Sequence, residues 1–300
     1  MRGRRVVEVS MAHYTSLRVG GLADLLLLPA DLDEVRAVVD CASTQDIPVT
    51  WLGNGSNLLV RARGLRGIIV SLRHACNDVS ALASDPERAL RPGDSVRVRV
   101  GAGAPLTRVL HLAIAQGLHG LSFAVGIPGT LGGAIMMNAG TEVGAIWDVV
   151  DRVTLLLPHG EMVDVGPEEV TVGYRYAALP EGSVVLEAIL RAECGSPQEI
   201  RQQVRQLYRC RRQRQPLSYP NAGSIFKNPP GERAGRLIDQ LGLKGYRIGD
   251  AQVSRKHANF IVNRGQASVD DVLTLIDLVK RQVCAHTGIV LEEEIHIVGE

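Results

Sequence analysis

The sequence lacks long apolar runs, an excess of charge of either sign and regularly spaced cysteines. The longest wholly apolar runs, such as residues 25–30, fall far short of the roughly 20 residues that a bilayer-spanning helix needs. Lys and Arg total 33 against 32 for Asp and Glu, so the formal net charge of the 300 residues is only +1. No bulk electrostatic field therefore favours nucleic acid or a membrane surface as a partner.

Cysteine and histidine spacing argues against metal and disulfide chemistry. The five cysteines are scattered and never spaced as C-x-x-C, so we expect reduced thiols rather than a disulfide framework or a zinc site. The eight histidines form no H-E-x-x-H pattern, and we assign no metal. Arg2, Arg4 and Arg5 are followed by no apolar segment. We therefore expect no secretory signal and a cytoplasmic location.

The chain does contain alternating strand and helix patterns, and its length suggests two or three domains. Asp31 or Asp33 can cap a helix that runs to Cys41, and Gly117 can end another. Periodicity predicts further helices at 106–116, 198–215, 234–241 and 269–286, and strands at 23–28, 48–52, 67–70, 95–100, 149–157, 184–194, 259–263 and 290–298. The alternation indicates α+β or α/β subdomains.

Two glycine-rich loops are candidate ligand sites. Residues 53–57, Gly-Asn-Gly-Ser-Asn, follow a predicted strand and have the build of an anion nest for phosphate, although a tight hairpin turn fits equally well. They match neither a P-loop nor a Rossmann fingerprint. A second tract covers residues 126–134 and continues to 138–140. The four glycines within 126–134 would each cost about 1 kcal/mol in a helix, which predicts non-helical backbone laid against a flat or phosphorylated ligand. A glycine-rich packing crossover is the alternative. Together the loops favour a dinucleotide held between them.

Residues 220–229, Pro-Asn-Ala-Gly-Ser-Ile-Phe-Lys-Asn-Pro, form a third polar loop, which we call the serine loop. Its two prolines exclude a helix interior or a central strand. Gly223 leaves the Ser224 hydroxyl unshielded, while Lys227 and Asn228 add a cation and an amide. The loop would present a hydroxyl to an anionic ligand, and a polar surface turn is the alternative.

Other polar residues carry weaker signals. Arg175 lies between two tyrosines and could hold a carboxylate, or could be a surface arginine on a strand. Glu292 and Glu294 fall on one face of the predicted last strand and Glu293 on the other, where three solvated carboxylates are the usual outcome.

Two basic or polar segments are equally ambiguous. Arginines recur at helical spacing over 201–214, either as a solvated face or as a means of attracting an anionic substrate. His257 and Asn259 border an apolar strand, as a ligand rim or as ordinary loop ends.

Taken together, these blocks resemble the UDP-N-acetylenolpyruvoylglucosamine reductase (MurB) family from Thr15 to the end of the chain. The two glycine loops and 138–140 alone indicate the wider FAD-binding, PCMH or vanillyl-alcohol-oxidase-type flavoproteins. The serine loop and the glutamate cluster narrow the resemblance to this one family. The matching blocks are 53–57, 126–133, 138–140, 173–175, 221–229 and 291–294.

The resemblance implies an α+β fold, in which a two-subdomain PCMH-type FAD-binding module precedes a C-terminal α/β substrate-binding domain. The expected FAD-binding subdomains are 1–73, which the C-terminal strand 295–300 could join, and 74–213. The substrate-binding domain is expected at 214–294.

The resemblance also implies a reaction. NADPH would reduce a bound FAD and be replaced by UDP-N-acetyl-3-O-(1-carboxyvinyl)-glucosamine, whose product is UDP-N-acetylmuramate for peptidoglycan. The flavin N5 would pass hydride to C3, Ser224 would deliver a proton to C2, and Arg175 and Glu294 would stabilise the charge that develops. We add that Lys227 would help Ser224, since a hydroxyl is a poor acid in water. No nucleic acid, membrane insertion or obligate protein partner is expected.

The same resemblance supplies the binding residues. The substrate is expected at Lys227, Asn228, His257 and Asn259. The cofactor is expected at Leu52, Gly53, Asn54, Gly55, Ser56, Asn57, Gly126, Ile127, Pro128, Gly129, Thr130, Gly132, Gly133, Ala134, Asn138, Ala139 and Gly140.

Departures from the family pattern remove no catalytic group. Leu22 stands where proline is common, Ala177 where serine is common, and 141–143 replace a smaller stretch. Ser224 follows Arg175 by 49 positions, which leaves no room for the extra tyrosine-bearing lid of one subgroup, so the chain resembles the lidless one. Two other functions stay open: an oxidase of the same flavoprotein fold, and a sugar-nucleotide binder without catalysis.

Overall fold

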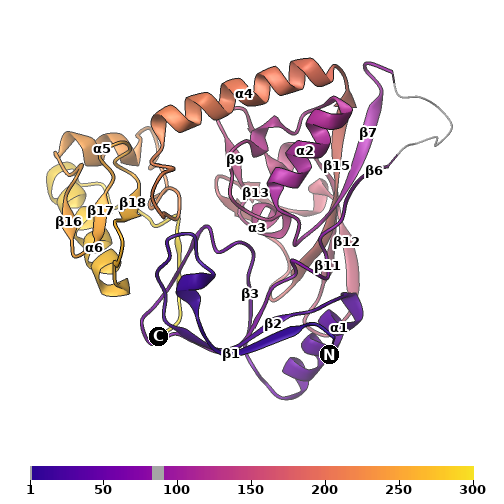
Figure 1. Ribbon diagram of the computed structural model, residues 1–300, viewed down its shortest axis with the longest axis horizontal. Coiled ribbons are helices and arrows are strands. Elements are labelled where there is room, and N and C mark those ends of the chain that lie inside the picture. Colours follow the sequence, from indigo (N-terminus) through magenta and orange to yellow (C-terminus); the bar gives the residue numbers. More distant parts are fainter. Residues whose placement is uncertain (1, 83–90) are drawn as a thin grey trace. The chain divides into compact units, whose positions relative to one another are not determined.

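The computed structural model describes residues 2–82 and 91–300 (Figure 1). Met1 and residues 83–90, which belong to the expected subdomains 1–73 and 74–213, lie outside the described residues. The chain divides into two compact units. The first comprises 1–5, 26–53 and 68–209, and the second comprises 6–25, 54–67 and 210–300.

An antiparallel sheet forms the centre of the first unit. Its strands follow the order β12-β11-β15-β7-β6, and β8 also pairs with β15. Side chains of β7 alternate between buried and exposed, as the sequence pattern predicts for a strand with one covered face. The strands are β6 (Val79–Leu82), β7 (Ser95–Gly101), β8 (Leu118–His119), β11 (Val150–Leu156), β12 (Met162–Val165) and β15 (Val184–Cys194).

The first unit contains the helices α1, α2 and α3, and capping residues explain where α1 begins and where α2 ends. In α1 (Leu32–Thr44), the Asp31 carboxylate caps the N-terminus by accepting a hydrogen bond from the Glu34 N–H at 3.1 Å. In α2 (Leu106–Gln116), Gly117 ends the helix in the left-handed conformation with φ +69°. Both boundaries confirm the sequence prediction. The short α3 (Leu131–Met136) packs on β15 and β7.

Four further strands form a second sheet, and four short strands form two hairpins. The sheet has the order β1-β2-β5-β3, and β3 runs parallel to β5. Its strands are β1 (Arg4–Ser10), β2 (Leu22–Leu28), β3 (Val49–Trp51) and β5 (Leu65–Val70). The hairpins are β9 (Gly140–Thr141) with β10 (Gly144–Ala145), and β13 (Val172–Gly173) with β14 (Tyr176–Ala177).

The second unit combines two helices with a three-stranded sheet of order β16-β17-β18, on which α6 packs (Figure 1). Ser268 caps α6 and Gly288 ends it with φ +73°. In the same unit, β19 pairs in parallel with β4. The elements are β4 (Leu58–Val60), α5 (Ala234–Gln240), β16 (Arg247–Ile248), β17 (Ala251–Val253), β18 (Ile261–Asn263), α6 (Val269–Thr287) and β19 (His296–Val298).

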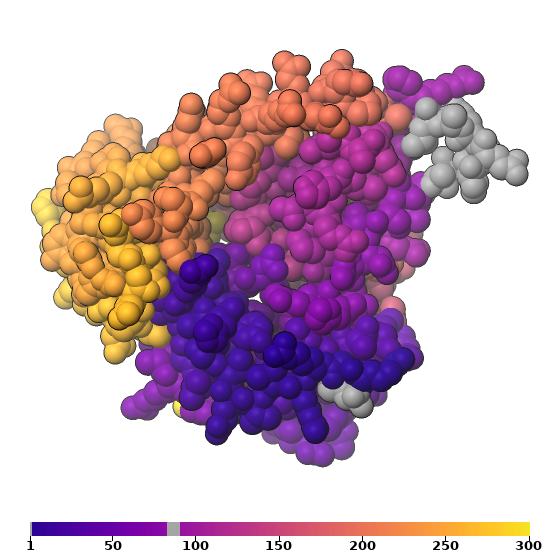
Figure 2. Space-filling view, viewed as in Figure 1, coloured from indigo at the N-terminus to yellow at the C-terminus, as the bar shows by residue number. Residues whose placement is uncertain are grey.

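The long basic helix α4 (Pro197–Arg214) is exposed over most of its surface. Ile200 is its one buried residue, and Arg201, Arg205, Arg209 and Arg212 are exposed. Figure 2 shows side chains of this helix, in orange, standing out from the molecular surface. Solvent therefore surrounds the arginines of 201–214, as both interpretations of this segment require.

The mixture of sheets and helices confirms the predicted α+β class. Within residues 2–82 and 91–300, no helix is both long enough and apolar enough to span a bilayer.

Two predictions of secondary structure were wrong. Residues 131–136 are helical despite Gly132 and Gly133, because Leu131, Ala134 and Ile135 are buried against the rest of the unit and this packing outweighs helix propensity. The last strand was expected over 290–298 but covers only His296–Val298. Residues 291–295 instead pair with the serine loop.

Candidate active site

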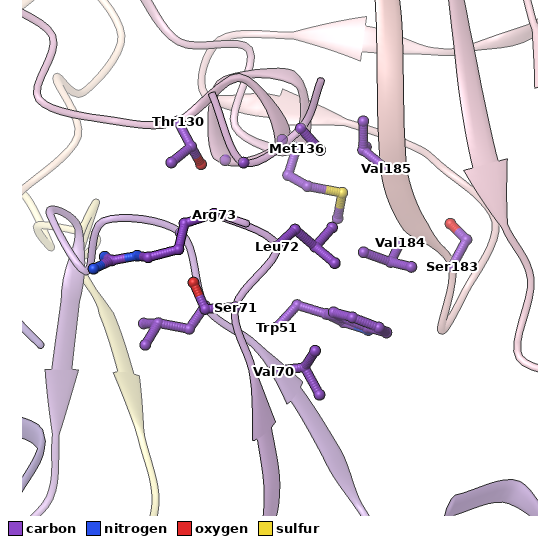
Figure 3. A pocket seen from close by; sticks show the side chains of 16 residues that line it. Trp51, Val70, Ser71, Leu72, Arg73, Thr130, Met136, Ser183, Val184 and Val185 are labelled. Atoms are coloured by element: carbon purple, nitrogen blue, oxygen red, sulfur yellow. The ribbon is translucent and has the colours of Figure 1, made fainter. Parts of the chain in front are cut away.

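A pocket of about 200 Å³ lies in the first unit, between the end of β3 and the start of α3 (Figure 3). Five of the residues expected to bind the cofactor line it: Leu52, Gly53, Thr130, Gly132 and Gly133. The apolar side chains of Trp51, Leu72, Met136 and Val184 surround the space, with the hydroxyls of Ser71 and Ser183 (Figure 3). Of the lining residues that the structure describes, Arg73 alone is charged.

Glycine creates this pocket in two ways. A Cβ on Gly53 would lie 2.7 Å from the Thr130 Oγ1, so glycine permits the close approach of the two loops. A Cβ on Gly133 would meet nothing nearer than the Thr130 Oγ1 at 3.7 Å, so that glycine leaves open space in the pocket. An open, mostly apolar slot with hydroxyls at its edge and one cation fits a flat ring system attached to phosphate. The residues present therefore fit FAD.

The residues at 53–57 do not all line the pocket: Gly53 does, and Gly55 and Asn57 do not. Gly55 has φ +59°, and a Cβ there would overlap the Tyr14 carbonyl oxygen. The Asn57 side-chain amide donates to the Glu294 carbonyl oxygen at 2.9 Å, while the Asn57 carbonyl accepts from the His296 N–H at 3.0 Å. Gly55 and Asn57 thus support packing within the second unit, next to a predicted catalytic glutamate.

The second glycine loop turns sharply before α3 begins. Gly126 has φ +72°, and the Ile127 N–H bonds the Ala124 carbonyl oxygen at 3.1 Å. Pro128 is exposed, and the Gly129 carbonyl accepts from Leu106 N–H at 3.1 Å. These bonds fix the loop so that α3 presents Gly132 and Gly133 to the pocket.

Residues 138–140 hold the hairpin that carries Arg175. The Asn138 side chain donates to the Gly173 carbonyl at 2.9 Å, and Arg175 Nη2 donates to the Gly140 carbonyl at 3.3 Å. Asn138 and Arg175 both have positive φ, at 40° and 58°, although neither is glycine. Such backbone strain persists where surrounding contacts over-determine it, and functional sites are enriched in it. The Arg175 guanidinium also lies over the Tyr174 ring, 5.1 Å from its centroid.

In the second unit, the serine loop is fixed on both sides of Ser224. Gly223 has φ +78°, and its N–H donates to the Asn221 Oδ1 at 3.0 Å, so the turn needs a residue without a side chain. Ile225 and Phe226 are buried in the core of the unit. Ser224 itself is half-buried at the edge of this anchored segment.

The glutamate segment pairs directly with the serine loop. The Glu294 N–H donates to the Ile225 carbonyl at 2.8 Å, and the Lys227 N–H donates to the Glu292 carbonyl at 2.9 Å. The Lys227 ammonium lies 3.4 Å from the Glu292 carboxylate, and Lys280 lies 2.6 Å from that of Glu293. The expectation of a solvated carboxylate holds for Glu292, whose side chain is 75% exposed, and was wrong for Glu293, which is only 29% exposed and pairs with Lys280.

The other residues expected at the substrate surround this loop in the second unit. Asn228 Oδ1 accepts from the Ala234 N–H at 3.1 Å, at the start of α5. His257 Nδ1 accepts from the Asn259 N–H at 3.2 Å, and its ring meets Phe260 edge-on at 4.9 Å. Burial lowers the pKa of His257, and the charge of Lys244 adds to this. Asn259 is buried, and its amide bonds the Phe226 backbone.

Sequence reasoning missed most of the pocket wall. Trp51, Ser71, Leu72, Arg73 and Met136 come from segments that are distant in sequence, and none forms a recognisable motif. The one available signal was position: 70–73 follow a predicted buried strand, and loops after strands commonly carry ligand contacts.

Comparisons with known proteins give a consistent result. Two family models match the chain, an FAD binding domain over residues 23–166 and the C-terminal domain of UDP-N-acetylenolpyruvoylglucosamine reductase over 215–298. Proteins named UDP-N-acetylenolpyruvoylglucosamine reductase are 42% identical in Pelobacter propionicus and 41% in Geobacter metallireducens. The aligned regions cover 100% of this chain and 97% and 96% of those proteins.

A solved structure is also similar over its whole length. The crystal structure of UDP-N-acetylenolpyruvylglucosamine reductase (MurB) from Thermus caldophilus is 37% identical, with a TM-score of 0.80 and complete coverage of both chains. These likenesses favour a reductase over both an oxidase of the wider flavoprotein fold and a binder without catalysis.

Proposed function

This chain belongs to the UDP-N-acetylenolpyruvoylglucosamine reductase family, and we propose that it reduces UDP-N-acetyl-3-O-(1-carboxyvinyl)-glucosamine to UDP-N-acetylmuramate with the residues named below. As a member of the family it is a flavoprotein oxidoreductase of peptidoglycan synthesis that uses FAD and NADPH. When bound, FAD supplies hydride for C3 of the enolpyruvyl group after NADPH has reduced it.

Ser224 is the proposed proton donor to C2. Gly223 removes any side chain that would shield the hydroxyl, and the buried Ile225 and Phe226 hold the serine at the edge of a rigid core. A positioned acid can speed proton transfer by about 10²–10⁴-fold. Lys227 lies three residues after Ser224, and its positive charge, which also pairs with Glu292, would make the hydroxyl a better donor.

Arg175 and Glu294 are the proposed stabilisers of the negative charge that spreads onto the substrate carboxylate. Arg175 can donate two parallel hydrogen bonds to a carboxylate, and its hairpin is held by Asn138 and Gly140. Glu294 can donate one only when protonated. Its backbone is fixed by Ile225 and Asn57.

The proposed cofactor residues are those predicted from sequence at 52–57, 126–130, 132–134 and 138–140. Leu52, Gly53, Thr130, Gly132 and Gly133 line the pocket and support this assignment most directly. Lys227, Asn228 and His257 are the proposed substrate contacts. For Asn259, a buried amide that already bonds Phe226, we propose a positioning role instead.

The proposal includes a three-part organisation of 1–73 with 295–300, 74–213 and 214–294. Parallel pairing of β19 with β4 supports the return of the last strand to the first segment. The two matched family models, at 23–166 and 215–298, support the remaining division. We also assign the chain to the lidless subgroup, because β15 and α4 occupy most of the interval between Arg175 and Ser224.

We place the reaction in the cytoplasm. Cys41, Cys76, Cys194, Cys210 and Cys284 are all unpaired in the structure. Free thiols persist in reducing compartments. Burial raises the pKa of the Cys76 thiol to about 11, which keeps it protonated and unreactive.

The observation that supports the proposed chemistry is the backbone pairing of the serine loop with the Glu294 segment, in which the Glu294 N–H donates to the carbonyl of Ile225, the residue after Ser224. An anaerobic titration tests the function. The purified protein should be yellow, NADPH should bleach it, and the enolpyruvyl sugar nucleotide should restore the colour. A colourless protein that cannot be reconstituted with FAD, or a bleached protein that the substrate leaves unchanged, would refute the proposal.

A further inference from the structure

Asn259 forms an unusually complete set of bonds with the segment that follows Ser224. Its side-chain Oδ1 accepts from the Phe226 N–H at 3.0 Å, and its Nδ2 donates to the Phe226 carbonyl at 2.7 Å. Its own carbonyl accepts from the Ile225 N–H at 2.9 Å. The residue is only 4% exposed, so water cannot replace these bonds.

The opposite edge of the same segment pairs with the glutamates. The Ile225 carbonyl accepts from Glu294 N–H at 2.8 Å, Phe226 and Glu293 form an isolated bridge, and the Lys227 N–H donates to Glu292. Residues 225–227 are therefore held between Asn259 on one side and 292–294 on the other. The three hydrogen bonds between Asn259 and the backbone of Ile225 and Phe226 fix the register of this segment.

We infer that Asn259 is a positioning residue for the reaction: its side chain holds the segment from Ile225 to Lys227 in the one register that sets Ser224 against Glu294. The amide works here as a substitute for a neighbouring strand, because it offers one acceptor and one donor at the spacing of a peptide group. Leucine and alanine supply neither, and serine has only one oxygen to serve both groups. This role rests on the proposed function of Ser224 and Glu294.

A second contact holds the backbone of Asn259 in place. His257 Nδ1 accepts from the Asn259 N–H at 3.2 Å, and this requires the neutral ring nitrogen. The histidine is in turn packed edge-on against Phe260. The His257 contact thus fixes the backbone of Asn259, from which the side chain extends to Phe226.

The chain offers a matched control in Asn263, which lies in the same unit and is 3% exposed. Its amide also bonds the backbone, donating to Leu17 at 3.2 Å and accepting from Gly265 at 2.9 Å and Ala267 at 3.1 Å. None of these side-chain bonds reaches the serine loop or the glutamate segment. The one bond to the loop comes from the Asn263 backbone N–H, which donates to the Pro220 carbonyl at 2.9 Å and is kept in alanine. Asn263→Ala should therefore cost stability by the same mechanism without displacing Ser224.

The test compares the two half-reactions of the FAD-loaded enzyme in anaerobic stopped flow. We expect Asn259→Ala to slow reoxidation by the enolpyruvyl sugar nucleotide by about 10–100-fold, the scale of a 1 Å misplacement, and to leave bleaching by NADPH within about twofold. Asn263→Ala should change neither rate by more than about twofold. Equal slowing by both variants at similar melting temperatures, or a wild-type reoxidation rate in Asn259→Ala, would overturn the inference.

Two further variants keep the test decisive if Asn259→Ala folds poorly. Asn259→Asp retains the shape and the acceptor for Phe226 N–H but loses the donor to its carbonyl, so reoxidation should still slow by about 10-fold. In a Ser224→Ala background, either substitution should slow reoxidation clearly less than in the wild type, since the group being positioned is gone. The same slowing in both backgrounds would contradict the inference. Failure of the wild type to reduce the substrate would instead refute the proposed function.

Discussion

The pocket of the first unit and the serine loop of the second are built by opposite means. The pocket depends on absent side chains: Gly53 lets two loops approach and Gly133 leaves space open. The serine loop depends on buried amides, with Asn259 bonding the backbone of the loop. Shape determines the first region and hydrogen bonding the second. Adding a methyl group should therefore damage the pocket, whereas removing an amide should damage the loop.

The largest expected effect is the loss of the proposed acid. Ser224→Ala should lower kcat for the enolpyruvyl substrate by about 10²–10⁴-fold, because no positioned hydroxyl remains to protonate C2. Steady-state assays of NADPH oxidation measure this loss. Ser218→Ala, an exposed serine in the same stretch of chain, is the control and should behave like the wild type. A wild-type kcat in Ser224→Ala would remove the serine from the mechanism.

Amide removal should cost the second unit stability. Asn259→Ala and Asn263→Ala each strand buried backbone groups, and each should lower the free energy of unfolding by about 1–3 kcal/mol. Urea titration followed by circular dichroism measures both variants. A loss below about 0.5 kcal/mol for either would show that this region does not depend on its amides as proposed.

Adding a methyl group to α3 should change the stability of the protein and its affinity for FAD in different ways. Gly133→Ala should stabilise the FAD-free protein by up to about 1 kcal/mol through helix propensity. It should also weaken FAD binding about 10-fold or more, since the new Cβ enters the pocket. Gly132→Ala is the contrasting variant, because its Cβ would press on the Ala102 Cβ at 3.1 Å. Flavin fluorescence titrations and thermal melts measure both quantities, and unchanged FAD affinity in Gly133→Ala would argue against cofactor at this position.

His257 predicts a pH dependence of smaller size. Its pKa in the folded protein is lowered by burial, and the ordinary value is about 6.5. The unfolded chain therefore binds more protons, so stability is complete above pH ~6.5 and falls as the pH drops below it. His257→Gln should flatten this slope in urea titrations between pH 5 and 8. Burial lowers the pKa of His296 in the same direction, so part of the slope should persist until that histidine is also replaced.

The smallest effect is expected at the surface of the glutamate segment. The Glu292 side chain is 75% exposed, and its ion pair with Lys227 spans 3.4 Å. Water screens such a pair. Glu292→Gln should change the free energy of unfolding by no more than about 0.5 kcal/mol. A larger loss in urea titration would mean that side-chain charge, rather than backbone pairing, holds this segment to the serine loop.

Local signals in the sequence were enough for the elements whose boundaries are set locally. Asp31 marks the start of α1 and Gly117 the end of α2, because capping depends on residues a few positions away. The strand at 184–194 was equally readable, since alternating and buried apolar residues extend along its whole length. The serine loop and its Ser224 were found for the same reason, as prolines and glycine fix a turn locally.

What the sequence could not provide depends on distant partners. Helix α3 forms because packing buries Leu131, Ala134 and Ile135. The local sequence did not predict this helix, because Gly132 and Gly133 lower its helix propensity. The residues at 291–295 leave the last strand because their partner is the serine loop, not β4. Asn259 was expected at the substrate, and its bonds to Phe226 could not be read from the sequence because that partner lies 33 positions earlier in the chain.

The central claim is that the glycine pocket serves the flavin and the serine loop serves the substrate, so that the two half-reactions can be damaged separately. Anaerobic stopped flow on FAD-loaded Ser224→Ala tests it most directly. The account predicts that NADPH bleaches this variant at a rate close to that of the wild type, and that the enolpyruvyl sugar nucleotide then restores the colour about 10²–10⁴-fold more slowly. Equal slowing of bleaching and recolouring would contradict it.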